Sequence, residues 1–184
     1  MKKAGVISLI IVLSILITSA GFISASVLNV CSSGCSYNKI QDAVNAAGTG
    51  DVINVSGESY NEDLIIYSNK TNLELVGAGS SSIIKGVNNV DSSLFPLAAP
   101  NIEILADGIK IHGFRIESPD YVSGKYSSGI VIGGKNIEIY NNNFIINSVD
   151  TSDDISQTIQ TYHKLAKPGV DISGLNIHDN SFTN

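Results

Sequence analysis

The sequence predicts an elongated β-solenoid, in which short strands of successive coils pair in parallel. The first observation is a repeated frame: Gly134–Phe144 (GKNIEIYNNNF) is echoed by Leu175–Phe182 (LNIHDNSF) and, in shortened form, by Gly108–Ile116 (GIKIHGFRI). The second is that one copy has too few apolar residues to bury a core, so it must stack on its copy in the next coil. The third is that no Asn-Gly turn separates the short strands, although hairpins commonly need one.

The segment 1–25 has the composition of a secretory signal peptide. Lys2 and Lys3 precede an apolar run over 4–20, and small residues follow at 24–26. This order predicts cleavage near Ala25 or Ser26 and a secreted or cell-surface protein, with residues 26–184 belonging to one β-helix domain. The alternative is an uncleaved membrane anchor, because the run is long enough to span a bilayer.

The charge of the chain excludes some partners. It has 17 acidic and 11 basic residues, and loss of Lys2 and Lys3 takes the net charge from −6 to −8. Arg115 is the single arginine, and there is no basic cluster. Nucleic acid is therefore not an expected partner, and a membrane is expected only through the N-terminal apolar segment.

Cys31 and Cys35 are the only cysteines and are spaced Cys-Ser-Ser-Gly-Cys. In an exported protein this spacing favours a small disulfide loop. A metal site would need further ligands, and neither His nor another Cys lies nearby. Attachment of a lipid to Cys31 is the remaining alternative.

A helix is predicted over 38–47, because Ile40, Ala43, Val44 and Ala47 share one helical face and two glycines follow. Beyond it the apolar period changes to two. Strands are predicted at 51–55, 64–66, 72–76, 83–84, 102–104, 109–111, 113–116, 129–132 and 137–139. Their spacing near the start would also suit a sandwich or barrel, and the later repeats favour the solenoid.

The repeat also predicts an asparagine ladder. Asn142 and Asn180 occupy one register just after a strand. A corner at this point needs left-handed backbone, which Asn tolerates, and an Asn there can hydrogen-bond to its copy one coil away.

The stretch 147–168 interrupts the repeat. Ile155, Ile159 and Tyr162 have helical spacing, and Pro168 ends the run. The stretch is interpreted as an excursion from a corner, with a helix as the conformation that the spacing favours. It has either a binding role, as long loops on solenoids often have, or none.

Two segments, Tyr37–Glu62 and Leu73–Gly86, resemble the N-terminal coil of pectin-lyase-like proteins, a superfamily that includes pectinesterases and exported archaeal and bacterial surface proteins. The resemblance implies an all-β fold, a right-handed single-stranded parallel β-helix with a short N-terminal capping helix. It implies no transferable catalytic site. The chain has no Trp and no Gln-Ala-Val segment after the first coil, as pectinesterases would have, and Arg115 lies in no cluster of the lyase kind.

Candidate site residues lie on the outward side of the repeat. His112, Tyr140 and His178 share one register and form a row of rings that could stack sugars, beside Lys110, Glu138 and Asn176. The alternative interpretation is a set of ordinary solvent-facing residues. Two His residues lack a third metal ligand, so no metal is predicted. No phosphate-binding loop or nucleophile elbow is present, so no cofactor is predicted either.

Two further motifs, an N-glycosylation pattern and a group of aspartates, are less specific indications of a site. Asn54 and Asn69 match the N-glycosylation pattern, and Asn69, in a turn, is the better acceptor. Asp150, Asp153 and Asp154 could bind calcium or act as paired carboxylates, but acidic residues at a helix start have the same pattern.

Two functions remain open. The first is an exported module with a structural role that binds polysaccharide or other surface proteins and has no activity of its own. The second is the N-terminal part of a polysaccharide-active enzyme. The chain ends at Asn184 within a repeat frame, so we expect further coils beyond it.

Overall fold

The computed structural model describes residues 24–89, 91–95, 98–118, 126–145, 157–161 and 170–183. The proposed signal segment lies almost entirely outside this range, as do Asp150, Asp153 and Asp154. Among the described residues no helix is long and apolar enough to cross a membrane.

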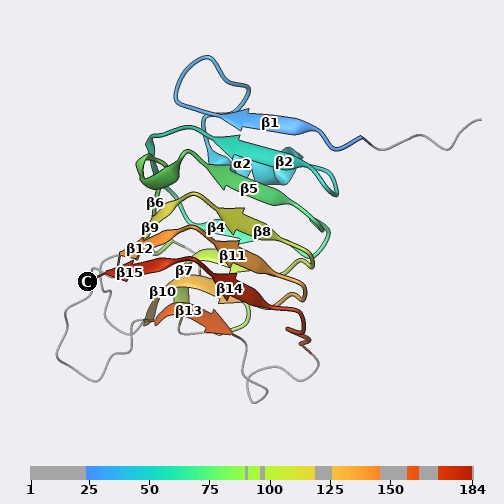
Figure 1. Ribbon diagram of the computed structural model, residues 1–184, viewed down its shortest axis with the longest axis vertical. Coiled ribbons are helices and arrows are strands. Elements are labelled where there is room, and N and C mark those ends of the chain that lie inside the picture. Colours follow the sequence, from blue (N-terminus) through green and yellow to red (C-terminus); the bar gives the residue numbers. More distant parts are fainter. Residues whose placement is uncertain are drawn as a thin grey trace, which may run out of the picture.

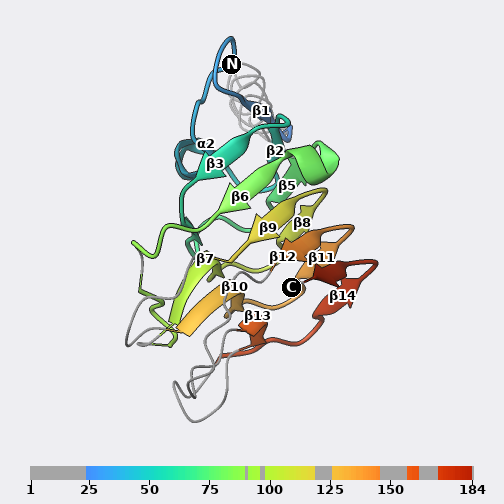
Figure 2. The ribbon, with the colours of Figure 1, turned by 90° about the vertical axis from the view of Figure 1, so that its left-hand side faces the viewer.

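The strands form three parallel sheets that run along one stack (Figures 1 and 2). Sheet A contains β1 (Val27–Val30), β2 (Val52–Val55), β5 (Glu74–Gly77), β8 (Lys110–His112), β11 (Glu138–Tyr140) and β14 (Asn176–His178). Sheet B contains β3 (Ser59–Asn61), β6 (Ile83–Lys85), β9 (Arg115–Glu117), β12 (Asn143–Ile145) and β15 (Ser181–Thr183). Sheet C contains β4 (Leu64–Ile66), β7 (Ala98–Ile104), β10 (Tyr126–Ile132) and β13 (Gln157–Thr161). The chain visits the sheets in the order A, B, C in each coil that has all three, so the predicted parallel β-helix is confirmed.

Identical positions of successive coils lie over one another and fill the core. Sheet A contributes an aliphatic row and sheet B a row that ends in two aromatic rings, Phe144 and Phe182, whose centroids are 5.2 Å apart. Inward residues of the last described coil have no described coil over them, and Ile177 is 39% and Phe182 52% exposed. The inward row of sheet A is Leu28, Ile53, Leu75, Ile111, Ile139 and Ile177, and that of sheet B is Tyr60, Ile84, Ile116, Phe144 and Phe182.

The corner that leads into sheet A is built from left-handed residues at one register. Their backbone φ angles lie between 55° and 82°, a region that Gly and Asn tolerate better than other residues. In all but the last of them the backbone N–H donates to a carbonyl of the next coil, as Asn136 does to Ser173 at 2.8 Å. The stacked residues are Gly50, Asn72, Gly108, Asn136 and Gly174.

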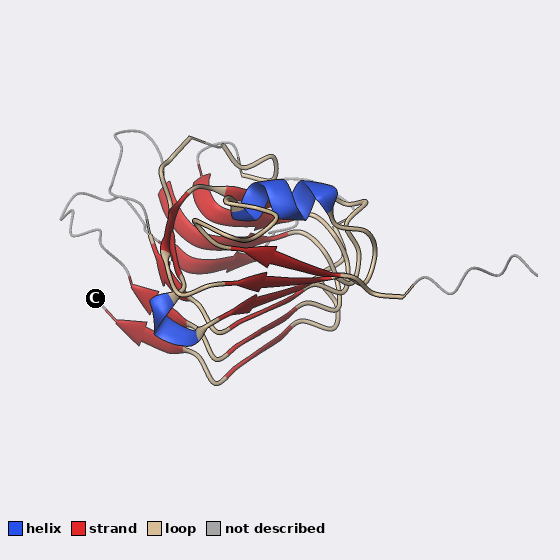
Figure 3. Ribbon diagram, turned by 90° about the horizontal axis from the view of Figure 1, so that it is seen from above, coloured by secondary structure: helices blue, strands red, loops and turns tan. Residues whose placement is uncertain are grey.

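Helix α2 (Ile40–Ala46) is slightly shorter than predicted and covers the N-terminal end of the stack (Figure 3). Ile40, Ala43 and Val44 are buried. The Glu62 carboxylate accepts the backbone N–H groups of Ile40 at 2.8 Å and Gln41 at 3.0 Å. The helix therefore has an N-cap from a distant residue. It ends at an extended Ala47, and the left-handed Gly50 belongs to the following corner.

The same helix closes the free edge of sheet C. The Gln41 side chain accepts the backbone N–H of Ile65 at 2.8 Å and donates to its carbonyl at 3.2 Å. This amide takes the place of a neighbouring strand at β4, so the edge has no open pairing groups at that residue. At the other end of the helix, Lys70 Nζ donates to the carbonyls of Asn45 and Ala47 at 2.7 Å each.

The predicted disulfide between Cys31 and Cys35 is confirmed. The chain that follows it folds back on β1, because Tyr37 forms a parallel bridge with Val30. The Tyr37 carbonyl accepts the N–H of Cys31 at 3.0 Å, and the Tyr37 N–H donates to the carbonyl of Asn29 at 3.3 Å. The disulfide loop thus partly covers the free edge of sheet A.

The helical interpretation of 147–168 is wrong where the structure describes it. Residues 157–161 form β13, which pairs in parallel with β10, with Ile159 opposite Ile130. The strand is favoured because β10 offers an otherwise open edge and an inward apolar site for Ile159. Thr158 and Thr161, both β-branched, also favour a strand.

Candidate functional site

The outward faces of sheets A and C differ in exposure. On sheet C, Glu103 points away from the solenoid core but is only 1% exposed, because the segment 92–95 lies over it. Its Oε1 accepts hydrogen bonds from Ser92 Oγ at 2.7 Å and from the backbone N–H of Ser93 at 2.8 Å. Leu94 packs beside it with Val131. The outward face of sheet A keeps exposed and half-buried polar residues, so it is the better candidate for ligand contact.

The ring row, His112, Tyr140 and His178, lies where the sequence analysis placed it. Tyr140 is opposite His112 on one side and opposite His178 on the other. The ring centroids of His112 and Tyr140 are 4.4 Å apart with an angle of 15° between planes, and those of Tyr140 and His178 are 5.2 Å apart with an angle of 5°. The three rings therefore stack on one another along the solenoid axis.

This stacking changes what the row can bind. Both faces of Tyr140 are covered by imidazoles, so a sugar cannot stack on that ring as the sequence analysis supposed. A ligand on this face would meet ring edges, above all the Tyr140 hydroxyl. Burial raises the pKa of the Tyr140 phenol, and Glu74 and Glu138 raise it further, so the hydroxyl keeps its proton at neutral pH and can donate it.

Charged side chains beside the row are already paired. Glu138 lies between Lys110, at 3.3 Å, and His178, at 3.4 Å. His178 Nδ1 also lies 2.8 Å from Asp179 Oδ2. At the other end of the row, His112 Nε2 lies 2.9 Å from Glu74 Oε1. The row is thus held by a network that links four successive coils.

This network predicts a pH dependence of stability. Hydrogen bonds to Asp179 and Glu138 raise the pKa of His178 above 6.5, so its contribution is complete below that value and is lost as the pH rises through the raised pKa. Hydrogen bonds from His178 and Lys110 lower the pKa of Glu138 below 4.5, so its contribution is present above 4.5 and is lost as the pH falls through the lowered pKa.

We therefore expect the thermal midpoint to decline from pH 5.5 to pH 8.5, and His178→Gln to remove part of that decline. Unfolding followed by circular dichroism at each pH measures both. An identical decline in the wild type and the variant would contradict the assignment to His178.

Beside the ring row, the corner between sheets A and B carries the expected asparagine ladder. Asn142 is 2% exposed, and its Oδ1 accepts the backbone N–H of Phe114 at 3.0 Å. Its Nδ2 donates to the carbonyl of Ile111 at 3.0 Å. Asn180 repeats the pattern one coil later, accepting the N–H of Asn142 at 3.0 Å and donating to Ile139 at 2.8 Å.

One detail of the ladder prediction is corrected. The left-handed residue is not the ladder Asn but the residue before it. Gly113, Asn141 and Asp179 have φ angles of 76°, 53° and 54° at one register. The ladder side chain can point into the corner because the preceding residue makes the bend, and that preceding side chain is directed to the surface.

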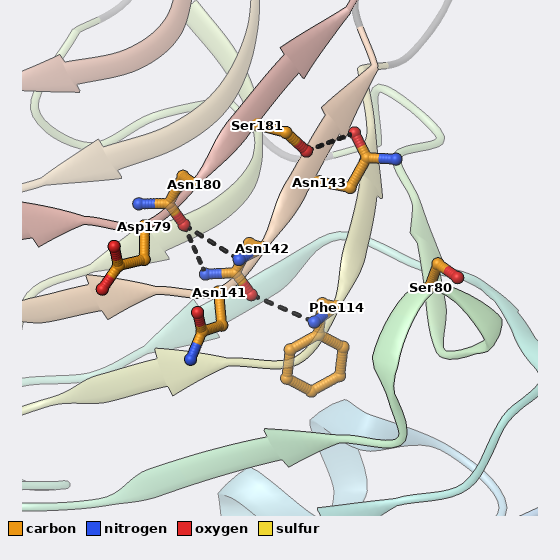
Figure 4. A pocket seen from close by; sticks show the side chains of 8 residues that line it. All are labelled: Ser80, Phe114, Asn141, Asn142, Asn143, Asp179, Asn180 and Ser181. Atoms are coloured by element: carbon orange, nitrogen blue, oxygen red, sulfur yellow. Dashed lines mark hydrogen bonds between the residues drawn. The ribbon is translucent and has the colours of Figure 1, made fainter.

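A polar groove of about 370 Å³ lies over this corner (Figure 4). Its wall is formed by η1 (Gly79–Ser81), where the corner between β5 and β6 is longer than in later coils. Asn141 and Asp179, at one register in adjacent coils, lie on the side next to the ring row, and Ser80 comes from η1. The groove is lined by Ser80, Phe114, Asn141, Asn142, Asn143, Asp179, Asn180 and Ser181.

Several groove groups are available to a ligand. The side chains of Asn141 and Ser80 make no hydrogen bond to another described residue, and Asp179 uses Oδ2 for His178. The Oδ1 of Asn143 accepts a hydrogen bond from Ser181 Oγ at 3.1 Å, and its Nδ2 is left to donate to a ligand. The groove therefore offers amide donors, amide and carboxylate acceptors and a hydroxyl within one surface.

Sequence reasoning missed the groove residues Ser80, Asn141 and Asp179. The signal was present for two of them, because Asn141 and Asp179 directly precede the ladder residues in both copies of the frame. The role of Ser80 depends on the longer corner at η1, which no repeat in the sequence indicates.

The two predicted glycosylation sites lie in different surroundings. Asn69 is exposed in a turn, where the Lys70 N–H donates to Tyr67 at 2.8 Å, whereas Asn54 is exposed on β2 between β1 and β5. Within the described ranges no group of three or more His, Cys, Asp or Glu residues could hold a metal ion.

Comparison with known proteins gives structural similarity alone. No family model and no curated protein sequence matches the chain. A pectin methylesterase from carrot superposes with a TM-score of 0.51 and 17% identity over 67% of this chain and 45% of the carrot enzyme. A pectin methylesterase in complex with a hexasaccharide has a TM-score of 0.44 and 18% identity, over 85% of this chain and 65% of that one. The enzyme from Aspergillus niger has a TM-score of 0.40 and 18% identity, over 84% and 74%.

The chain spans less than half the length of the carrot enzyme. At this level of identity the similarity concerns the arrangement of the coils and not the residues on them. The three parallel sheets and the superposition on the carrot enzyme lead to one conclusion about the fold. The chain has a parallel β-helix fold like that of the carrot pectin methylesterase, as the resemblance to pectin-lyase-like proteins implied.

Proposed function

We propose that this protein is an exported β-helix module that binds extracellular polysaccharide at the corner groove and the adjoining edge of the ring row. The observation that carries the proposal is the groove itself, because its unengaged groups are amide, hydroxyl and carboxylate groups on a rigid corner. Sugar hydroxyls donate and accept at once, and such paired groups can satisfy both roles. Their backbone is fixed by the ladder, so little ordering is needed on binding.

Export of the protein is supported by two features. The apolar run over 4–20 has the form of a signal peptide. The disulfide between Cys31 and Cys35 is of a kind that persists in oxidising compartments. Asn69, exposed in a turn, is the proposed acceptor for an N-linked glycan.

The second candidate is the N-terminal part of a polysaccharide-active enzyme. The superposition on less than half of the carrot pectin methylesterase favours it, because further coils would then carry the reacting groups. A binding module and an enzyme would both bind polysaccharide, but only the enzyme would convert it to product. Release of methanol or reducing ends from polysaccharide by the full-length protein would decide for the enzyme.

Binding can be tested with variants that preserve the corner. Asn141→Gly removes the amide and keeps a residue that tolerates the left-handed backbone. Tyr140→Phe removes the hydroxyl and keeps the ring stack. We expect each to weaken binding to oligosaccharides about fivefold to tenfold, as loss of one hydrogen bond with partial desolvation does.

The matched control is Asn136→Gly, since Asn136 is exposed and left-handed at φ 55° but lies at the other corner of sheet A. Titration calorimetry with a panel of neutral and acidic hexasaccharides measures the effect. Equal affinities for Asn141→Gly, Tyr140→Phe and wild type would exclude the groove as the binding site.

A further inference from the structure

We infer that the groove selects uncharged glycan chains over polyuronates and that Asp179 is the residue that sets this selection. The inference rests on the proposed function, since it names the ligand class of the same site.

The charge of the groove lining disfavours an anionic ligand. Asp179 is the only charged residue among the described residues that line the groove. Its side chain is 73% exposed, and Oδ2 is held by His178 while Oδ1 faces the surface without a described partner. A neutral diol can donate to this oxygen. A uronate carboxylate at the same place would face a like charge, and no cationic side chain is among the described residues that line the groove.

The cationic side chains next to the groove are already paired with carboxylates. Lys110 and His178 both pair with Glu138. On the sheet B side of the corner, Arg115 Nη2 pairs with Glu117 Oε1 at 2.7 Å. A uronate would have to compete with these carboxylates for its counter-charge. The described surface around the groove therefore lacks the unengaged Arg or Lys that recognition of carboxylates commonly uses.

The position of Asp179 in the repeat allows its charge to be removed without a change of backbone. Asp179 and Asn141 occupy the same register in adjacent coils, and strands in neighbouring coils are about 4.8 Å apart. Their φ angles are 54° and 53°. One coil thus offers a carboxylate where the other offers an amide, so Asp179→Asn changes charge at a position whose backbone already accepts Asn. The new amide oxygen can still accept from His178 Nδ1.

The experiment compares hexasaccharide pairs that differ in charge and share linkage. The probes are β-1,4-mannohexaose with β-1,4-hexamannuronate, and cellohexaose with the corresponding hexaglucuronate. We expect wild-type protein to bind the neutral member of a pair at least about fivefold more tightly than the uronate. Asp179→Asn should lower this ratio of affinities about threefold, mainly because it binds the uronate more tightly than the wild type does. Added salt should strengthen uronate binding by the wild type, because it screens repulsion.

The outcomes separate the two claims. Failure of wild-type protein to bind any probe overturns the proposed function and this inference with it. Equal or tighter binding of the uronate by wild type overturns the inference and leaves polysaccharide binding intact. If Asp179→Asn leaves the ratio of the two affinities, for the neutral and for the uronate hexasaccharide, unchanged, Asp179 is not the residue that selects between them.

Discussion

Asn142→Ala is expected to lower the free energy of unfolding by about 2–3 kcal/mol, because it leaves a buried backbone N–H without its partner and removes a second hydrogen bond. The N–H is that of Phe114, which the Asn142 Oδ1 accepts at 3.0 Å, and the second bond runs from Asn142 Nδ2 to the carbonyl of Ile111 at 3.0 Å. Alanine is too short to reach either group, and the corner is closed to water at this point, since Asn142 is 2% exposed. Chemical denaturation followed by circular dichroism measures the change.

The control for this variant is the next residue. Asn143 is half-buried on the outward side of β12, and its side chain accepts one hydrogen bond, from Ser181 Oγ. Asn143→Ala should cost at most about 1 kcal/mol. Similar losses for both variants would show that the ladder amide has no special role at the corner.

Gly134→Ala is the second large effect, with an expected loss of about 3 kcal/mol or more. A Cβ at this position would overlap the carbonyl oxygen of Ala106 in the preceding coil. Neither group can rotate away, because both belong to the backbone of stacked coils. The two coils would have to separate locally and give up hydrogen bonds between them. Chemical denaturation measures this loss as well.

Gly48→Ala is the matched control for this steric argument. Its Cβ would meet only Asp51 Oδ2, at 3.5 Å, which is an ordinary contact. We expect it to change stability by less than about 1 kcal/mol. A Gly134→Ala protein with wild-type stability would mean that the coils at Ala106 and Gly134 are not packed as closely as described.

The sequence was sufficient for the architecture because stacking makes its signals repeat. Ile111, Ile139 and Ile177 recur with the outward residues between them, so both the inward row and the ring row could be placed from the sequence alone. The ladder residues Asn142 and Asn180 were found for the same reason. Repetition also indicates where the backbone bends between sheets A and B. The sequence prediction placed the left-handed residue one position too late, at the ladder Asn instead of the residue before it.

Features that occur once were harder to predict. The strand at 157–161 depends on the open edge of β10, and local spacing of Ile155 and Ile159 points to a helix. The cover over Glu103 depends on the path of residues 92–95. The mutual stacking within the ring row depends on side-chain rotamers, which a register does not fix. These are tertiary effects that override local pattern.

The claim that the corner groove is the glycan-binding surface is tested most directly by nuclear magnetic resonance. Backbone and side-chain amide signals would be followed while a neutral hexasaccharide that binds is added to isotopically labelled protein. We expect the largest chemical-shift changes at Asn141, Asp179 and Tyr140, with the Asn136 signals unchanged. Shifts centred on the outward face of sheet C, around Glu103 and Leu94, would contradict it.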